Sequence, residues 1–246
     1  MNEDKGQERS YVSTLIRIKK YRKKEPTMER IIDSQLEDLK KLMLEMGGLV
    51  EKALTSTTAG LLKKELNQLK EVHRIEFLIN ELQIKIDNAC LQVLAKQGPV
   101  AKDLRLILAI IKINTDLERM GDQCVNVAHI GRELIERGFS NSLQDLELMA
   151  GCAGKMVKAA LDSFVKMDVE AANKVLGMDD QVDAFRTKIY QHSIQSMKTD
   201  IEHLQDHLDF ILIARNLERL GDHSTNIAED VIFAFSGKDV RHGSND

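Results

Sequence analysis

The chain has 246 residues, of which 43% are hydrophobic and 30% are charged, and its formal net charge is −4. This composition is that of an ordinary soluble globular protein with room for one large or two small domains, and the acidic balance argues against a general nucleic-acid-binding protein. Three cysteines without a Cys-x-x-Cys pair indicate neither a disulfide framework nor a zinc ribbon. With no apolar run near the roughly 18 residues that span a bilayer, and no signal-peptide pattern, we expect a cytoplasmic protein.

The residue types favour helices throughout. The chain has only two prolines and no tryptophan, and it is rich in Leu, Met, Ala, Lys and Glu rather than in the β-branched and aromatic residues of strands. We therefore expect an all-α fold. Residues 1–27 are crowded with lysine and arginine and are interpreted as a basic, disordered tail, with a membrane-surface or nucleic-acid contact as the alternative.

Three long amphipathic stretches follow the tail. Apolar residues recur at helical spacing from Met28 to Leu54 and again over 66–91, after which Gly98 and Pro99 interrupt the chain. A third stretch runs over 101–138, which as a helix would be on the order of 55 Å long. The spacing predicts three long rods.

The chain then repeats itself. The hexapeptide Leu-Glu-Arg-Met-Gly-Asp at 117–122 returns as Leu-Glu-Arg-Leu-Gly-Asp at 217–222, a shift of 100 residues, and upstream a shift of 103 matches Met46 to Met149 and Val72 to Val175. We interpret this as a tandem duplication of a three-helix bundle, because one such helix cannot bury its apolar stripe alone. The expected parts are a basic tail, a first repeat, a second repeat and a C-terminal tail, at 1–27, 28–139, 140–237 and 238–246.

Each repeat carries a pair of carboxylates four residues apart. Glu118 and Asp122, and likewise Glu218 and Asp222, would lie one above the other on the same helix face, about 40° apart. Like charges at this spacing repel one another, so a compensating positive charge is expected.

The preceding helix of each repeat offers further oxygen ligands. Asp179 and Asp183 have this spacing in the second repeat, and Glu76 and Asn80 occupy the matching positions of the first. Four such side chains on adjacent helices would suit magnesium, manganese, iron or zinc.

Four residues beside these sites have expected supporting roles. Asn126 and Asn226 follow the carboxylate pairs by one turn and could add a ligand or orient the carboxylates. Gly121 and Gly221 would let a neighbouring helix or a ligand come close.

The alternative is an ordinary charged surface. Arg119 could pair with Asp122, and Arg219 with Asp222, at the i,i+3 spacing. The recurrence of the acidic pattern in both repeats favours metal binding over a solvated face.

Other candidate sites are weaker. His203 and His207 are four residues apart but lack the glutamate of a His-Glu-x-x-His motif, and we expect them at an exposed helix start. Without Glu-x-x-His an oxygen-activating di-iron bundle is disfavoured, and no covalent catalytic signature is apparent. Four methionines on apolar stripes are expected in the core, namely Met43, Met46, Met149 and Met156.

The motifs together resemble the PhoU family, over about residues 30–235. The resemblance rests on Leu-Glu-Arg-[Met/Leu]-Gly-Asp-x-x-x-Asn-[Val/Ile]-Ala in both repeats, on Pro-Val-Ala-x-Asp-Leu-Arg at 99–105, and on the two-copy layout. It implies two three-helix bundles side by side, with multinuclear iron or zinc clusters on the bundle surface of some members. Asn80 departs from the family's carboxylate pairs, so the first site should be the weaker one.

The resemblance also implies a function. It is that of a cytoplasmic, non-enzymatic negative regulator that links the phosphate ABC transporter ATPase to a sensor histidine kinase, acts as a homodimer, and reaches the membrane only through protein partners. Two rivals are a metal-dependent hydrolase that uses bound water and a metal-free helical scaffold.

Overall fold

The computed structural model describes residues 31–139, 143–238 and 240, and every regular element among them is a helix. The predicted tail at 1–27, the predicted helix start at Met28 and most of the C-terminal tail lie outside the described residues. Within these residues the helices, in chain order, are α2 (Ile31–Leu62), α3 (Leu66–Gln97), α4 (Ala101–Arg137), α5 (Gln144–Lys166), α6 (Val169–Leu176), α7 (Asp179–Met197) and α8 (Leu204–Ser236).

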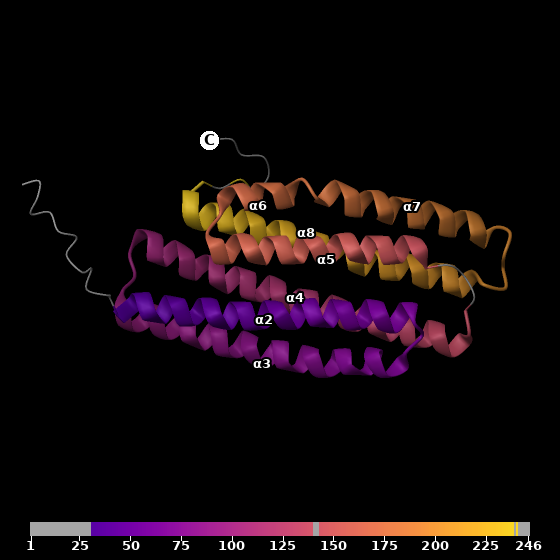
Figure 1. The fold of residues 1–246 in the computed structure, drawn as a ribbon, viewed down its shortest axis with the longest axis horizontal. Coiled ribbons are helices and arrows are strands. Elements are labelled where there is room, and N and C mark those ends of the chain that lie inside the picture. The colour runs from indigo at the N-terminus through magenta and orange to yellow at the C-terminus, as the bar shows by residue number, and fades with distance from the viewer. Residues whose placement is uncertain (1–30, 140–142, 239, 241–246) are drawn as a thin grey trace, which may run out of the picture.

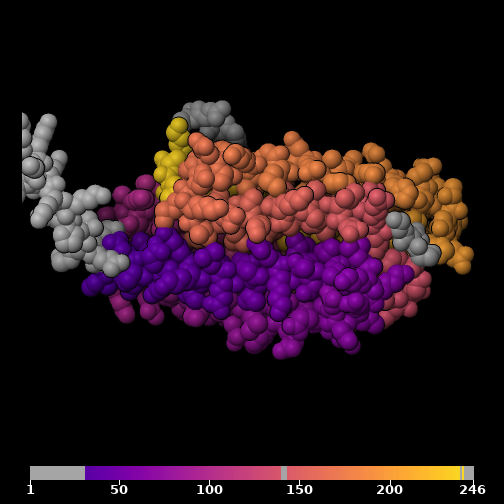
Figure 2. Space-filling model, in the orientation of Figure 1, coloured from indigo at the N-terminus to yellow at the C-terminus, as the bar shows by residue number. Residues whose placement is uncertain are grey.

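The helices are arranged as two antiparallel three-helix bundles (Figure 1). In the first, α2, α3 and α4 pack on one another; in the second, α5 and α8 pack together with α6 and α7, which share the position of one rod. The bundles lie against each other along their length (Figure 2), joined by α4 with α8 and by α2 with α5. The all-α fold of two side-by-side bundles is thereby confirmed. The exact domain limits remain predictions.

Each rod forms because its apolar residues repeat at helical spacing and its ends carry suitable stops. The predicted core methionines Met43, Met46, Met149 and Met156 are all completely buried, as the stripes indicated. Gly138 ends α4 in the left-handed region at φ 79°, and its N–H donates to the Ile135 carbonyl. A residue with a side chain would be strained in this conformation.

The second rod of the second repeat is broken into α6 and α7, whereas the predicted duplication of a three-helix bundle has one helix at this place. Gly177 and Met178 separate α6 from α7. The short α6 has its own N-terminal cap, because the Asp168 carboxylate accepts a hydrogen bond of 3.0 Å from the Ala171 N–H.

The expectation for the two histidines is wrong in part. His203 is partly exposed and pairs with Asp200 at 3.0 Å, but His207 is 3% exposed and its ring packs edge-on against Phe210. The start of α8 is packed rather than exposed, since Arg137 of α4 contacts Asp206 beside His207.

An ion-pair clamp holds the two bundles together at this end. Arg137, the last residue of α4, contacts Asp206 at 3.2 Å and also Asp209, both on the first turns of α8 and both buried. Phe139 packs edge-on against Phe210 beside it. None of the helices in the described ranges is long and apolar enough to cross a membrane.

Candidate functional site

Two groups of polar side chains lie where the sequence predicted them. The first cluster contains Glu76 and Asn80 of α3 with Glu118 and Asp122 of α4, and the second cluster contains Asp179 and Asp183 of α7 with Glu218 and Asp222 of α8. The carboxylates act across the helix pair in both clusters, since Glu76 helps to raise the pKa of Glu118 and Asp183 helps to raise the pKa of Asp222. The structure therefore brings all eight predicted side chains into two groups of four.

A glycine sets the spacing between the helices at each cluster. A Cβ added at Gly221 would lie 3.2 Å from the Asp179 carboxylate oxygen, and one added at Gly121 would lie 3.1 Å from the Ile79 side chain. Both are tighter than normal contacts. The predicted close approach of the neighbouring helix is confirmed, and in the second cluster the atom that comes close is itself a candidate ligand.

Mutual repulsion shapes the second cluster. Burial raises the pKa of Glu218, and the neighbouring Asp222 raises it further. Burial and the Asp183 carboxylate raise the pKa of Asp222. The pKa of Asp179 is also raised, first by burial and then by the Asp183 and Asp222 carboxylates. A group of four carboxylates in which the pKa values of Glu218, Asp222 and Asp179 are raised is a site in which a cation is favoured.

An arginine supplies part of that positive charge. Arg186 of α7 lies with its Nε 3.4 Å from Glu218 and 3.8 Å from Asp183, and its charge opposes the rise in the pKa of Glu218. Arg186 is not among the residues predicted from the sequence. Its position three residues after Asp183, on the same helix face, was the available signal.

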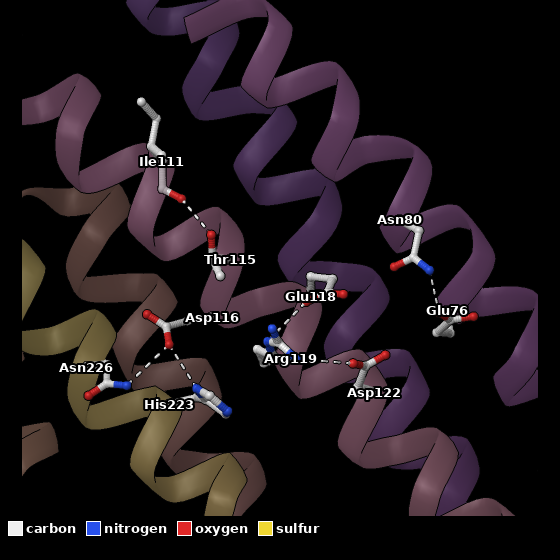
Figure 3. A network of polar contacts seen from close by, with 10 residues as sticks. All are labelled: Glu76, Asn80, Ile111, Thr115, Asp116, Glu118, Arg119, Asp122, His223 and Asn226. Carbon is white, nitrogen blue, oxygen red and sulfur yellow. Dashed lines mark hydrogen bonds and ion pairs between the residues drawn. The ribbon is translucent and has the colours of Figure 1, made fainter.

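The first cluster is arranged differently because it contains an amide. The Asn80 amide nitrogen donates to the Glu76 carboxylate (Figure 3). This leaves the buried Asn80 carbonyl oxygen without a hydrogen-bond partner among the described residues. The cluster has one charge fewer than the second and one unsatisfied neutral oxygen.

In the first cluster, Arg119 of α4 is the compensating cation. Its guanidinium lies 3.7 Å from Glu118 and 4.0 Å from Asp122, so the predicted surface ion pair exists but is loose (Figure 3). Burial raises the pKa of Glu118, as do the Asp122 and Glu76 carboxylates, while Arg119 opposes the rise.

A histidine links the two clusters at the seam between α4 and α8. The His223 Nδ1 lies 2.8 Å from the Asp116 carboxylate, and the Asn226 amide donates to the same oxygen at 3.2 Å (Figure 3). Burial is the main cause that raises the pKa of Glu118 and of Asp222, and the imidazole is close enough to both to oppose the rise. No spacing in the sequence reveals this contact, because Asp116 and His223 are 107 residues apart.

The two predicted supporting asparagines have different positions. Asn226 lies at the helix seam on Asp116, where it fits an orienting role better than a ligand role in the second cluster. Asn126 is exposed on α4, and it makes no hydrogen bond to a cluster side chain within the described ranges.

The clusters have suitable donors for a hard cation but are not in ligating geometry. No group of three or more His, Cys, Asp or Glu side chains in residues 31–139, 143–238 and 240 is arranged to hold a metal ion. Arg186 and Arg119 lie among the carboxylates instead. Metal binding would require these exposed arginines to swing away and the carboxylates to converge.

Known proteins share this architecture. The family model described as the PhoU domain matches residues 43–131 and 146–231. A Pseudomonas aeruginosa protein named phosphate-specific transport system accessory protein PhoU homolog is 36% identical, over 85% of this chain and 87% of its own length. The Escherichia coli protein named phosphate-specific transport system accessory protein PhoU is 29% identical, over 87% of this chain and 89% of its own length.

Solved structures agree. The crystal structure of PhoU from Pseudomonas aeruginosa has a TM-score of 0.81 at 35% identity, covering 84% of this chain and 99% of that one. The phosphate transport system regulatory protein PhoU from Streptococcus pneumoniae has a TM-score of 0.79 at 26% identity, covering 85% and 99%. The chain, with two bundles that each match the family model, belongs to the PhoU family.

Proposed function

We propose that this protein is a metal-binding regulator of phosphate uptake that acts as an accessory to a phosphate-specific transporter. The family membership and the names of the relatives support the transport role. The observation that supports metal binding is the pair of clusters, in which burial and neighbouring carboxylates raise the pKa of Glu118 and of Glu218 beside arginines that only partly neutralise the negative charge.

The ligands would come from both helices of each cluster. In the second cluster, Asp179, Asp183, Glu218 and Asp222 offer only carboxylate oxygens, which suit magnesium, manganese, iron or zinc. In the first, Glu76, Glu118 and Asp122 would be joined by the unsatisfied carbonyl oxygen of Asn80. With one carboxylate fewer, the first cluster would bind a cation less tightly.

A bound cation would supply positive charge, and the chain's own residues would create the docking surface. Once the cluster carboxylates are neutralised, Arg119 and Arg186 are released from them and become available to a phosphate group or an acidic partner. The clusters lie on partly open helix faces, with Asp183 52% and Asp122 39% exposed. An open face suits a partner surface better than a hydrolase, which must exclude water from its substrate.

The proposed partners are those of a signalling accessory protein. They are the ATPase of the phosphate ABC transporter and a sensor histidine kinase, whose starvation signal the protein would keep off when phosphate is plentiful. The setting would be cytoplasmic, the protein would act as a homodimer without an enzymatic activity of its own, and it would meet the membrane only through these partners.

The test is a comparison of two double variants in cells that lack their own copy of this regulator. Glu218→Ala with Asp222→Ala removes two carboxylates from the second cluster, and Glu133→Ala with Glu136→Ala removes two exposed carboxylates elsewhere. We expect the first variant to lose metal, co-purification with the transporter ATPase and repression of a starvation reporter, and the second to keep all three. A first variant with normal metal content and full repression would overturn the proposal.

A further inference from the structure

One outer helix carries an apolar stripe that faces solvent. On α3, Phe77, Ile84 and Leu91 are 61%, 62% and 60% exposed. They are spaced by seven residues, so they lie nearly in line along the helix, drifting by about 20° per step. Exposed apolar residues scattered singly are ordinary, but three in a row form a strip of the kind that pairs with another helix.

The fold itself does not require this stripe. The matching positions in the second repeat, 103 residues later, are Asp180, Thr187 and Ile194. Since α7 takes the place of α3 in an equivalent bundle, the apolar residues of α3 are not needed to build that bundle. Their role must therefore be sought outside it.

We propose that a second copy of this chain covers the stripe, with its α3 packed antiparallel on this one about a two-fold axis at Ile84. Phe77 and Leu91 lie seven residues on either side of Ile84. An antiparallel pairing centred there places Phe77 of each copy against Leu91 of the other and Ile84 against itself. The surface is thus complementary to its own copy, as a two-fold interface demands.

The flanking charges fit the same arrangement. Glu81 and Lys85 lie on one flank of the stripe, and neither makes an ion pair within the described part of the chain. In an antiparallel pair the same flanks of the two helices meet, and Glu81 of each copy comes within about 3 Å, along the axis, of Lys85 of the other. A parallel pair would bring unlike flanks together and would separate these charges.

The size of the stripe sets the expected strength. At their exposed fractions the three side chains present on the order of 300–400 Å² of surface, which is about half of what one partner contributes to a standard interface. The neighbouring polar residues of α3 must supply the rest. We therefore expect a dimer that dissociates on dilution. This inference rests on the homodimer named in the proposed function and identifies its surface.

Sedimentation velocity over roughly 1–100 µM, the range in which an interface of this size is expected to dissociate, tests the surface. The variants are Ile84→Glu and its matched control Thr187→Glu, at the equivalent exposed position of α7; circular dichroism checks that both remain folded. We expect at least a tenfold weaker dimer for I84E and an unchanged one for T187E. A wild type that stays monomeric throughout, or an I84E dimer as strong as wild type, would overturn the inference.

Cysteine cross-linking tests the orientation. In a Cys152→Ser background, Cys90 and Cys124 are buried and cannot link copies. Ile84→Cys should form a covalent dimer alone, whereas Phe77→Cys and Leu91→Cys should do so only when mixed, since a disulfide needs Cα atoms within about 7 Å. Efficient linking of Phe77→Cys to itself would refute the antiparallel arrangement. Metal content measured on I84E separates the two proposals, because metal binding does not depend on this surface.

Discussion

Removing one carboxylate from the second cluster should stabilise the protein while weakening its metal binding. Asp222 is repelled by Glu218, Asp183 and Asp179. Each like-charged pair at close spacing costs about 0.2–0.5 kcal/mol, so Asp222→Asn should raise the free energy of unfolding by about 1 kcal/mol in chelator at low salt. Asp222 makes none of the close ion pairs of this cluster within the described residues, so the substitution removes little favourable electrostatic energy.

The pH dependence follows from the sign of the shift. Burial and Asp183 raise the pKa of Asp222 in the folded state, so its ionised form is disfavoured by folding. The penalty is fully present at neutral pH and disappears as the pH falls through the folded pKa. The advantage of D222N should therefore vanish below about pH 4, the ordinary range of an aspartate.

Urea unfolding followed by circular dichroism measures this effect. A gain of this size would move the midpoint by roughly 0.3–0.5 M urea, and the gain should shrink in high salt. Glu45→Gln, an exposed change of equal charge on α2, is the control and should have little effect. A D222N variant that is less stable than wild type at neutral pH would show that the cluster is held by attraction, and would refute this account of the site.

Two further predictions concern the packing that positions the clusters. Gly47→Ala should be about 2 kcal/mol less stable than Gly48→Ala. The new Cβ would lie 2.7 Å from Leu161 in the first variant and would meet nothing within 4 Å in the second. Thermal unfolding of both variants measures the difference, and equal stabilities would contradict the tight α2–α5 contact. Arg137→Ala should lower the free energy of unfolding by about 2–4 kcal/mol, because Asp206 and Asp209 stay buried without their cation, and it should leave the metal content unchanged. Urea unfolding and metal analysis measure the two effects. A loss of stability below about 0.5 kcal/mol would show that this ion pair does not stabilise the contact between the bundles.

The sequence predicts the local features of this molecule well. The length of α4, the burial of Met43 and Met156 and the close approach at Gly221 all follow from spacing on a single helix or from the repeat. These features depend on helical periodicity, which can be recognised from the order of neighbouring residues.

Features that depend on tertiary contacts could not be predicted from the sequence. The break at Gly177 was hidden because the matching region of the first repeat, α3, is continuous. His207 was expected to be exposed because nothing in the sequence shows that the start of α8 is packed against other parts of the fold. The contact of His223 with Asp116 joins residues that only the packing of α4 on α8 brings together.

The most direct test of the account is metal analysis of protein purified without chelator and without metal from an affinity column. Wild type is compared with the quadruple variant in which Glu118, Asp122, Glu218 and Asp222 are alanine, and with the Glu133→Ala, Glu136→Ala control. The account predicts iron, zinc or manganese in the wild type and the control, and its loss in the quadruple variant. Wild-type protein that contains no metal and takes up none on incubation with these ions would contradict it.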